Sequence, residues 1–198
     1  NVTSARIILV SAQRRRVTLL LGSYQGTARR ARRIKRTPRN LDFVSWSPFS
    51  GAMRDPFLQA AIDEARQGLV EGGIPIGSVI VHRETIIGRG HNMRVQKGDP
   101  LLHGEMSAFQ RAGRQPASVY RECTLYTTLS PCPMCSGTAL LYKIPKIVIG
   151  ENQTFLGAEE WLRTQGVQLD VVQDGECIEM MRKFIAERPE LWNEDIAI

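Results

Sequence analysis

Hydrophobic and polar positions divide the chain into an irregular first part and a strongly patterned second part. From Asp55 onward, apolar residues recur at spacings of three and four, which predicts an amphipathic helix. Asp55-Pro56 is typical of an N-cap followed by proline at the first helical position, and Glu71-Gly72-Gly73 would end the helix. The apolar positions of this helix are Phe57, Leu58, Ala61, Ile62, Ala65 and Leu69.

The rest of the patterned part alternates between strands and helices. Two short β-rich runs, 76–82 and 85–89, are separated by a tight turn and predict a hairpin, and a loop follows over 92–101. Further helices are predicted over 103–112, 133–142, 159–164 and 176–187, and further strands over 124–128, 146–149 and 167–172. This alternation predicts an α/β fold in which helices cover both faces of a layered sheet.

The first part, residues 1–54, is basic and shows little amphipathic periodicity. It holds 12 of the 26 Lys and Arg residues but only one of the 20 acidic residues, Asp42. Three interpretations remain open: a disordered leader that binds polyanions, a mitochondrial transit peptide, or an extension that is not a native part of the fold. The chain begins with Asn1, and Met53 stands directly before the first predicted helix. We therefore expect a leader over 1–54 and one domain over 55–198.

The charge balance of the second part limits its partners. The remaining 144 residues carry 14 basic and 19 acidic groups, so the net charge of +6 belongs to the leader. A mildly acidic domain argues against a large nucleic-acid footprint, because phosphate binding needs clustered Lys and Arg. No apolar run approaches the ~20 residues that span a bilayer.

Cysteine use indicates metal chemistry. Four cysteines are present, and we recognise no signal peptide before them, so we expect a reducing compartment in which a close pair binds metal or is catalytic. Cys132 and Cys135 form such a pair in Pro131-Cys132-Pro133-Met134-Cys135, and His103-Gly104-Glu105 opens the preceding long helix. In a layered α/β fold, the first turns of these two helices can lie side by side at the strand ends.

These residue types suit the hydrolysis of an amine on an aromatic ring. One imidazole and two thiolates supply three ligands, which leaves the fourth tetrahedral position of zinc for a water that ionises near pH ~7. Glu105 lies two residues from His103 and could move protons from the water to the ring and the leaving amine. His-x-Glu followed by Pro-Cys-x-x-Cys is the signature of zinc deaminases.

Two alternatives to a catalytic metal are a structural zinc site and a redox cysteine pair. A structural zinc site would need a fourth protein ligand, but Cys123, Cys177, His82 and His91 do not stand at paired zinc spacing. A redox Cys-x-x-Cys would leave His103 and Glu105 without a role.

Residues 55–198 resemble fungal-type cytosine deaminases of the cytidine deaminase-like superfamily. The resemblance runs through segments spread over most of this part: 72–77, 88–94, 96–98, 102–105, 125–132, 150–152, 187–189 and 192–196. It implies a three-layer α/β/α sandwich with a central mixed five-stranded sheet, one zinc per chain, a homodimer, and the deamination of cytosine to uracil in pyrimidine salvage. A cytoplasmic enzyme is expected, with mitochondrial targeting by the leader as the alternative.

The resemblance also implies roles for residues around the pocket. Asn92 would bond the edge of the pyrimidine, and the Gly104 N–H would donate to its carbonyl. The Ser130 carbonyl and Asp195 would accept from the exocyclic amine. Two aromatic residues, Phe155 and Trp192, would stack on the base.

Further expectations follow from the C-terminal segment and from two departures. The segment past Pro189 would fold back as a lid over the pocket. Lys143 stands where a small residue is expected after a tyrosine, and Thr138 replaces an expected alanine. Both could perturb packing or the dimer face, and neither belongs to the proposed metal ligands.

Other functions are compatible with the same metal motif. A tRNA adenosine deaminase has a similar metal motif, but it usually carries Ala where this chain has Gly104, and its anionic substrate favours a basic rim. Guanine or another small amino-heterocycle is a further candidate. A non-catalytic module with structural zinc is the alternative from a different class, and it would leave Glu105 without function.

Overall fold

The structure, a computed structural model, describes residues 54–198, so the predicted leader lies outside the described residues except for Arg54. The described helices are α1 (Pro56–Val70), α2 (Arg94–Lys97), α3 (Gly104–Ala112), α4 (Ala117–Tyr120), α5 (Pro133–Leu141), α6 (Glu159–Thr164), α7 (Gly175–Glu187) and α8 (Pro189–Asp195). The strands are β1 (Gly77–His82), β2 (Thr85–His91), β3 (Cys123–Leu129), β4 (Lys146–Glu151) and β5 (Gln168–Val171).

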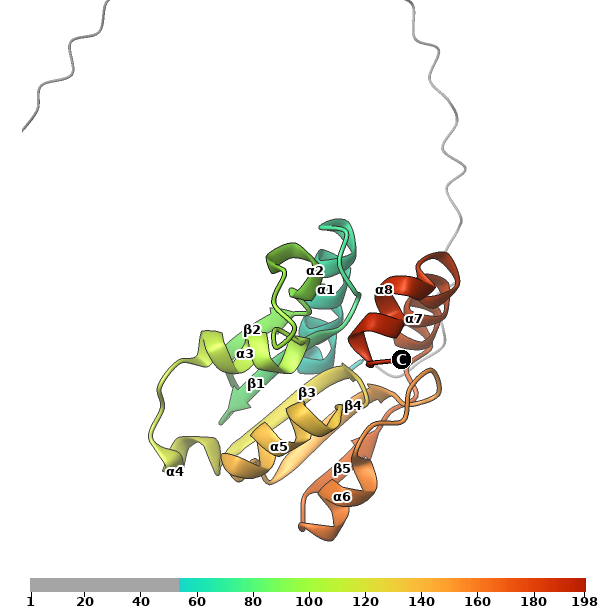
Figure 1. Cartoon of the computed structure of the whole chain (residues 1–198). Coiled ribbons are helices and arrows are strands. Elements are labelled where there is room, and N and C mark those ends of the chain that lie inside the picture. Colours follow the sequence, from blue (N-terminus) through green and yellow to red (C-terminus); the bar gives the residue numbers. More distant parts are fainter. Residues whose placement is uncertain (1–53) are drawn as a thin grey trace, which may run out of the picture. The chain divides into compact units, whose positions relative to one another are not determined.

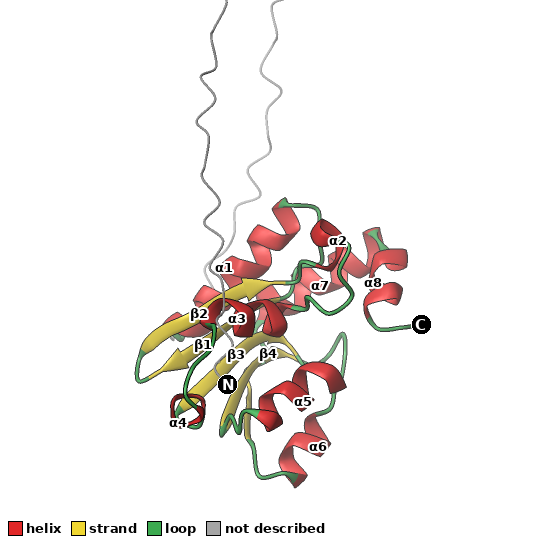
Figure 2. Ribbon diagram, turned by 60° about the vertical axis from the view of Figure 1, so that its left-hand side comes forward, coloured by secondary structure: helices red, strands yellow, loops and turns green. Residues whose placement is uncertain are grey.

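The five strands form one mixed sheet in the order β2-β1-β3-β4-β5 (Figures 1 and 2). β1 pairs antiparallel with both β2 and β3, whereas β3, β4 and β5 run parallel. The predicted hairpin is confirmed: Arg83 and Glu84 both have positive φ (45° and 64°), as a two-residue turn that matches strand twist requires. Helices α5 and α6 make the crossovers between the parallel strands.

Helices cover both faces of this sheet, which confirms the predicted α/β/α sandwich (Figure 1). On one face, buried residues of α1 and α7 pack on β1, β3 and β4; examples are Ile62, Val79 and Cys177. On the other face, residues of α3, α5 and α6 pack on the same strands, as Ala108, Ala139 and Leu162 do. None of the helices within residues 54–198 combines the length and the apolar character that crossing a membrane requires.

The start of the domain is fastened by a cap and an ion pair. The Asp55 side chain accepts from the backbone N–H groups of Phe57 and Leu58, so the predicted N-cap is confirmed. Arg54, counted with the leader on sequence, lies 2.9 Å from Asp174 and 3.0 Å from Glu176, at the start of α7. Arg54 thus contributes to the contacts that join the start of α1 to the start of α7.

Three short helices were not predicted. α2 lies inside the expected loop 92–101, and α4 precedes β3; each has only four residues, too few to display helical periodicity. α8 forms the C-terminal segment that was expected to fold back, with Pro189 at its first position.

The C-terminus of α5 explains why Lys143 stands out in the sequence. The N–H of Ile144 bonds the carbonyl of Ala139, and the N–H of Lys143 bonds that of Leu140, which together form a Schellman motif. Lys143 occupies the left-handed position of this motif, with φ 58°, where glycine is strongly preferred because it has no Cβ.

Lys143→Gly should therefore stabilise the protein by about 1 kcal/mol, because glycine has no Cβ to clash in the left-handed backbone conformation. Chemical denaturation would measure the change. Lys143→Ala is the matched control, since it removes the exposed side chain but keeps the Cβ, and it should change stability little. Equal gains from both variants would show that the side chain, and not the backbone, is strained.

A buried histidine ties α1 to β2. His91 is 3% exposed, and its Nδ1 and Nε2 lie 3.0 Å from Glu64 and Glu71 respectively. The hydrogen bond with Glu64 raises the pKa of His91, with a smaller contribution from Glu71, and burial opposes the rise. Imidazolium is therefore the form that this site favours.

The stabilisation by His91 should depend on pH. Because the folded-state pKa is raised above the unfolded value of about 6.5, the stabilisation is complete below that pH and is lost as pH rises through the folded-state value. The difference in melting temperature between the wild type and His91→Gln should thus shrink from pH 6 to pH 9. A constant difference across this range would mean that His91 contributes by packing alone.

Candidate metal centre and active site

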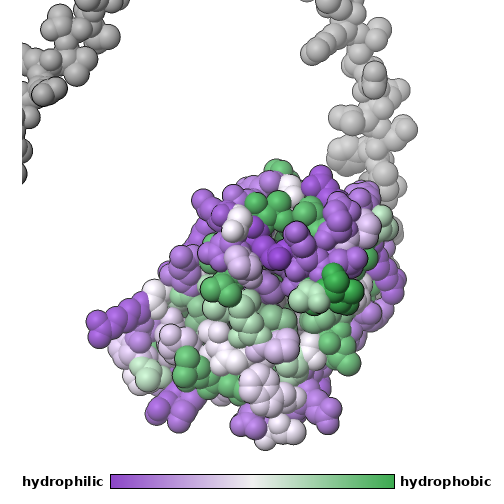
Figure 3. Space-filling model, viewed as in Figure 1, coloured by the Kyte–Doolittle hydropathy of each residue, from purple (hydrophilic) through white to green (hydrophobic). Residues whose placement is uncertain are grey.

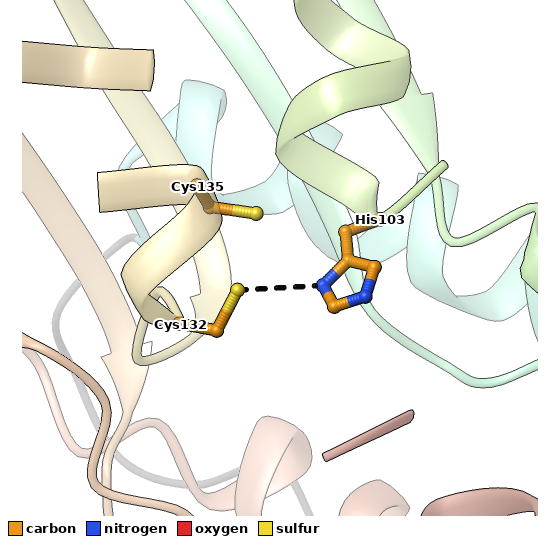
Figure 4. A group of neighbouring side chains, drawn as sticks. All are labelled: His103, Cys132 and Cys135. Carbon is orange, nitrogen blue, oxygen red and sulfur yellow. Dashed lines mark hydrogen bonds between the residues drawn. The ribbon is translucent and has the colours of Figure 1, made fainter. Parts of the chain in front are cut away.

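Three potential metal ligands meet between α3 and α5. The ligand atoms of His103, Cys132 and Cys135 all lie within 4.8 Å of one another. The Cys132 Sγ lies 3.6 Å from the Nδ1 of His103. Figure 4 shows these two side chains facing each other, with Cys135 pointing into the same space. The structure thus brings together the three residues that the two sequence motifs singled out.

Helix geometry explains why these side chains meet. His103 is the N-cap of α3 and Cys132 is the N-cap of α5, with nearly identical backbone angles (φ −65°, ψ 166° and φ −65°, ψ 169°). Cys135 follows in the first turn of α5, so its side chain lies on the same side as the cap. The prediction that the two helix N-termini lie side by side is confirmed.

The electrostatics of this cluster favour a thiolate. Hydrogen bonds from Cys135 and from His103 lower the pKa of Cys132 to about 4, although burial opposes this. Burial lowers the pKa of His103, but the bond with Cys132 and the charges of Asp195 and Glu105 outweigh it and raise the pKa to about 9. An imidazolium beside a thiolate is the state that a metal ion replaces with release of a proton.

The donor set fits zinc. Two sulfurs and one ring nitrogen within this span match the ligands that tetrahedral zinc takes, and three protein ligands are the number found in catalytic sites. Glu105 lies beside the cluster and is 3% exposed. Burial raises the pKa of Glu105, which brings proton exchange by its carboxylate closer to neutral pH.

Two buried hydroxyls orient Glu105, and sequence reasoning missed both. The Thr127 hydroxyl donates to Glu105 Oε1 over 3.2 Å, and the Ser78 hydroxyl donates to Thr127 Oγ1 over 3.0 Å. Ser78 and Thr127 are direct partners in the β1–β3 pairing. Their position in strands that are buried almost throughout was the only signal that could have indicated them.

A small pocket opens beside the cluster. The empty space between its walls and in its open mouth amounts to about 290 Å³. It is lined by seven of the residues predicted for the site, His103, Glu105, Ser130, Cys132, Phe155, Trp192 and Asp195, and by three that were not predicted, Ile76, Leu129 and Ile196. The unpredicted residues are apolar, so their sequence pattern does not differ from that of the core.

Three predicted residues, Asn92, Gly104 and the ligand Cys135, do not line this pocket. Asn92 is fully buried, its amide donates to Asp195 over 2.8 Å, and its carbonyl oxygen accepts from the Arg94 N–H. Gly104 lies against β1, and a Cβ there would meet the Ile76 carbonyl oxygen at 2.9 Å. Asn92 therefore positions the side-chain carboxylate of Asp195. Gly104, which has no Cβ, lets α3 approach Ile76 in the pocket wall closely.

The C-terminal helix folds back over the pocket, as expected. Trp192 is 5% exposed and packs edge-on against Phe155, with ring centroids 5.7 Å apart. Asp195 Oδ1 lies 3.6 Å from His103 Nε2, and burial raises the pKa of Asp195 against the charge of His103. α8 thus brings both an apolar wall and a carboxylate to the cluster.

Comparison with known proteins adds sequence relatives. The cytidine and deoxycytidylate deaminase zinc-binding region matches residues 53–151. The cytosine deaminase of Candida albicans is 54% identical over 140 residues, which are 70% of this chain and 93% of that protein. The tRNA-specific adenosine deaminase of Bacillus subtilis is 33% identical over 141 residues, which cover 66% of this chain and 88% of that protein.

Solved structures agree on the fold. A structure from a study of A-to-I editing by tRNA:A34 deaminases superposes with a TM-score of 0.55 at 27% identity, covering 64% of this chain and 99% of that one. The guanine deaminase from Nitrosomonas europaea superposes with a TM-score of 0.55 at 18% identity, covering 71% and 88% respectively. At that identity, the second likeness concerns the fold alone.

The cluster predicts how the chain binds metal. The wild type should hold about one zinc per chain, and Cys132→Ala or Cys135→Ala should lose most of it because two ligands do not suffice. Elemental analysis of the purified protein would measure this. Cys177→Ala, which removes a buried thiol on α7, is the matched control and should keep the metal. Zinc retained at full stoichiometry by both ligand variants would show that the ion is held elsewhere.

Proposed function

This chain belongs to the zinc-binding cytidine and deoxycytidylate deaminase family, and from that premise we propose that it hydrolyses cytosine to uracil and ammonia. One observation carries the proposal: a cluster of three zinc-type ligands stands beside a small pocket, which two of them line together with a buried carboxylate and two aromatic residues. The Candida albicans relative, 93% of which aligns with this chain, is a cytosine deaminase. The pocket suits a small planar base.

The proposed chemistry needs a nucleophile and a proton carrier. Zinc, held by His103, Cys132 and Cys135, would supply the Lewis acidity that makes water nucleophilic near neutral pH. The Glu105 carboxylate takes a proton from the attacking water and gives it to the ring nitrogen. It then takes the remaining proton from the hydroxyl now bonded to the ring carbon and delivers it to the amine. The carbon–nitrogen bond breaks, the hydroxyl oxygen becomes the new carbonyl, and the products are uracil and ammonia.

The pocket walls are assigned to recognition of the base. The Ser130 carbonyl and Asp195 accept from the amine of the substrate, which discriminates against a carbonyl there. Phe155 and Trp192 stack on the ring. Gly104 and Asn92 do not line the pocket in this structure; with the base bound, the Gly104 N–H would donate to the ring carbonyl, and Asn92, whose amide donates to Asp195, would contact the ring edge.

A tRNA adenosine deaminase is the second candidate, because relatives with that activity match most of the domain. Two observations disfavour it. The part of the chain after residue 54 carries more acidic than basic groups, and α8 covers the pocket so that Trp192 is almost fully buried. A polynucleotide needs a basic rim and an open approach.

We further propose that two chains form a homodimer through the face of α5 and α6. Large hydrophobic residues are exposed on these helices and on the segments next to them: Leu141 (74%), Leu156 (66%), Trp161 (44%) and Tyr142 (41%). Figure 3 shows hydrophobic and neutral residues over the part of the surface where Figure 1 places α5 and α6. Several large apolar side chains exposed on one face are typical of an interface. Light scattering that gave the mass of one chain, 22.2 kDa, would contradict the dimer.

The cellular role follows from the chemistry. Release of uracil from cytosine returns a free base to pyrimidine metabolism, so we assign the chain to pyrimidine salvage in the cytoplasm. Mitochondrial targeting by the leader stays a prediction, because the leader lies outside the described residues.

An ammonia-release screen over cytosine, cytidine, adenine, guanine and a tRNA anticodon stem tests the substrate. Cytosine should be the preferred substrate, since the pocket is small and covered. Preferred turnover of the tRNA stem would overturn the proposal in favour of the second candidate.

Glu105→Gln tests the proton carrier. It should keep one zinc per chain but lower kcat on cytosine by about 10²–10⁴-fold, because an amide cannot carry protons. Steady-state kinetics together with elemental analysis measure both quantities. Glu179→Gln, on the exposed surface of α7, is the matched control. Wild-type kcat in Glu105→Gln would exclude Glu105 as the carrier.

A further inference from the structure

A second buried carboxylate lies behind the pocket wall. Glu159, the first residue of α6, is only 2% exposed. Its Oε1 accepts from the Ser130 hydroxyl over 2.9 Å and from the Asn152 amide over 3.0 Å, and its Oε2 accepts from Arg163 over 2.9 Å. A buried carboxylate is costly unless it is hydrogen-bonded, so breaking any of these bonds is unfavourable. The bonds therefore restrain the side chains of Ser130, Asn152 and Arg163.

Through Ser130, Glu159 reaches the turn between β3 and α5. The Ser130 hydroxyl also accepts from the Gly157 N–H over 3.0 Å, and the carbonyl of the next residue, Pro131, accepts from the Ala158 N–H over 3.0 Å. The loop between β4 and α6 is therefore bonded directly to the two residues that precede Cys132.

The other end of that loop is held in the same way. Glu151, at the end of β4, is fully buried and accepts from the backbone N–H groups of Gln153 and Thr154 over 2.6 and 3.0 Å. Phe155, which lines the pocket, lies between the two carboxylates in sequence. The loop thus has a defined conformation and can act as a rigid support.

We propose that Glu159 is a positioning residue that sets the direction of the Ser130 carbonyl toward the amine of the substrate. The inference rests on the proposed function, which gives that carbonyl the role of acceptor. The Ser130 hydroxyl donates to Glu159 and accepts from Gly157, so the residue is held from both sides. A hydrogen bond weakens steeply when its acceptor turns away, so this restraint controls how well the amine is bound.

Four variants separate positioning from general stability. Ser130→Ala removes the anchored hydroxyl and keeps the backbone carbonyl. Glu159→Ala removes the anchor itself. Glu159→Gln keeps an oxygen that can accept from Ser130 and Asn152, so it should retain the activity that Glu159→Ala loses. Glu160→Ala, the exposed neighbour in α6, is the matched control.

The readout compares two ligands that differ at the amine. For each variant, kcat/KM on cytosine is measured beside the inhibition constant of pyrimidin-2-one, which has the same ring and carbonyl but no amine. Ser130→Ala and Glu159→Ala should lower kcat/KM roughly tenfold and leave the inhibition constant within about twofold. Glu159→Gln and Glu160→Ala should stay within about threefold of the wild type in both quantities.

Other outcomes overturn the inference. An equal loss for both ligands would mean that Glu159 only stabilises the fold, and no loss for either would mean that the carbonyl needs no restraint. If Glu159→Ala does not fold, Ser130→Ala decides alone. A wild type that releases no ammonia from cytosine would refute the proposed function as well, whereas an active wild type with unaffected variants refutes the positioning role alone.

Discussion

The contact between two helix N-termini is the constraint on which the site depends. His103 and Cys132 cap α3 and α5 with the same extended backbone geometry, and their side chains meet at 3.6 Å. This meeting requires β1 and β3 to pair in the observed register, because α5 follows β3 directly and α3 packs on β1. The pairing of β1 with β3 therefore sets the distance between His103 and Cys132.

Polar groups around this contact are buried and bonded, which gives the site a fixed shape. Thr127 and Ser78 orient Glu105 from the sheet side, whereas Asn92 holds Asp195 from the loop after β2. Because these groups are buried, losing the partner of any one of them would cost free energy, so the hydrogen bonds restrain the arrangement together. Preorganisation of this kind lets a site stabilise charge without rearranging during the reaction.

The pocket walls come from parts of the chain that the sheet does not position by itself. Trp192 and Asp195 arrive on α8 after a fold-back of the C-terminal segment, and Phe155 arrives on the loop between the two buried carboxylates, Glu151 and Glu159. The metal cluster and the recognition walls thus depend on different supports. Substitutions in one support can change substrate binding while the ligand set stays intact.

Local pattern determined much of what sequence analysis predicted. The Asp55 cap, the hairpin, the main helices and strands, and the motifs His103-x-Glu105 and Cys132-x-x-Cys135 each depend on neighbours a few residues apart, where backbone periodicity sets direction. Asn92, Asp195 and the two aromatic walls were reached only through family resemblance. Thr127, Ile76, Ile196 and Glu159 were missed. Their contacts join positions such as 105 with 127 and 130 with 159, 22 and 29 residues apart. Only the tertiary path of the chain decides such contacts, because no local spacing records which strand or loop will lie opposite.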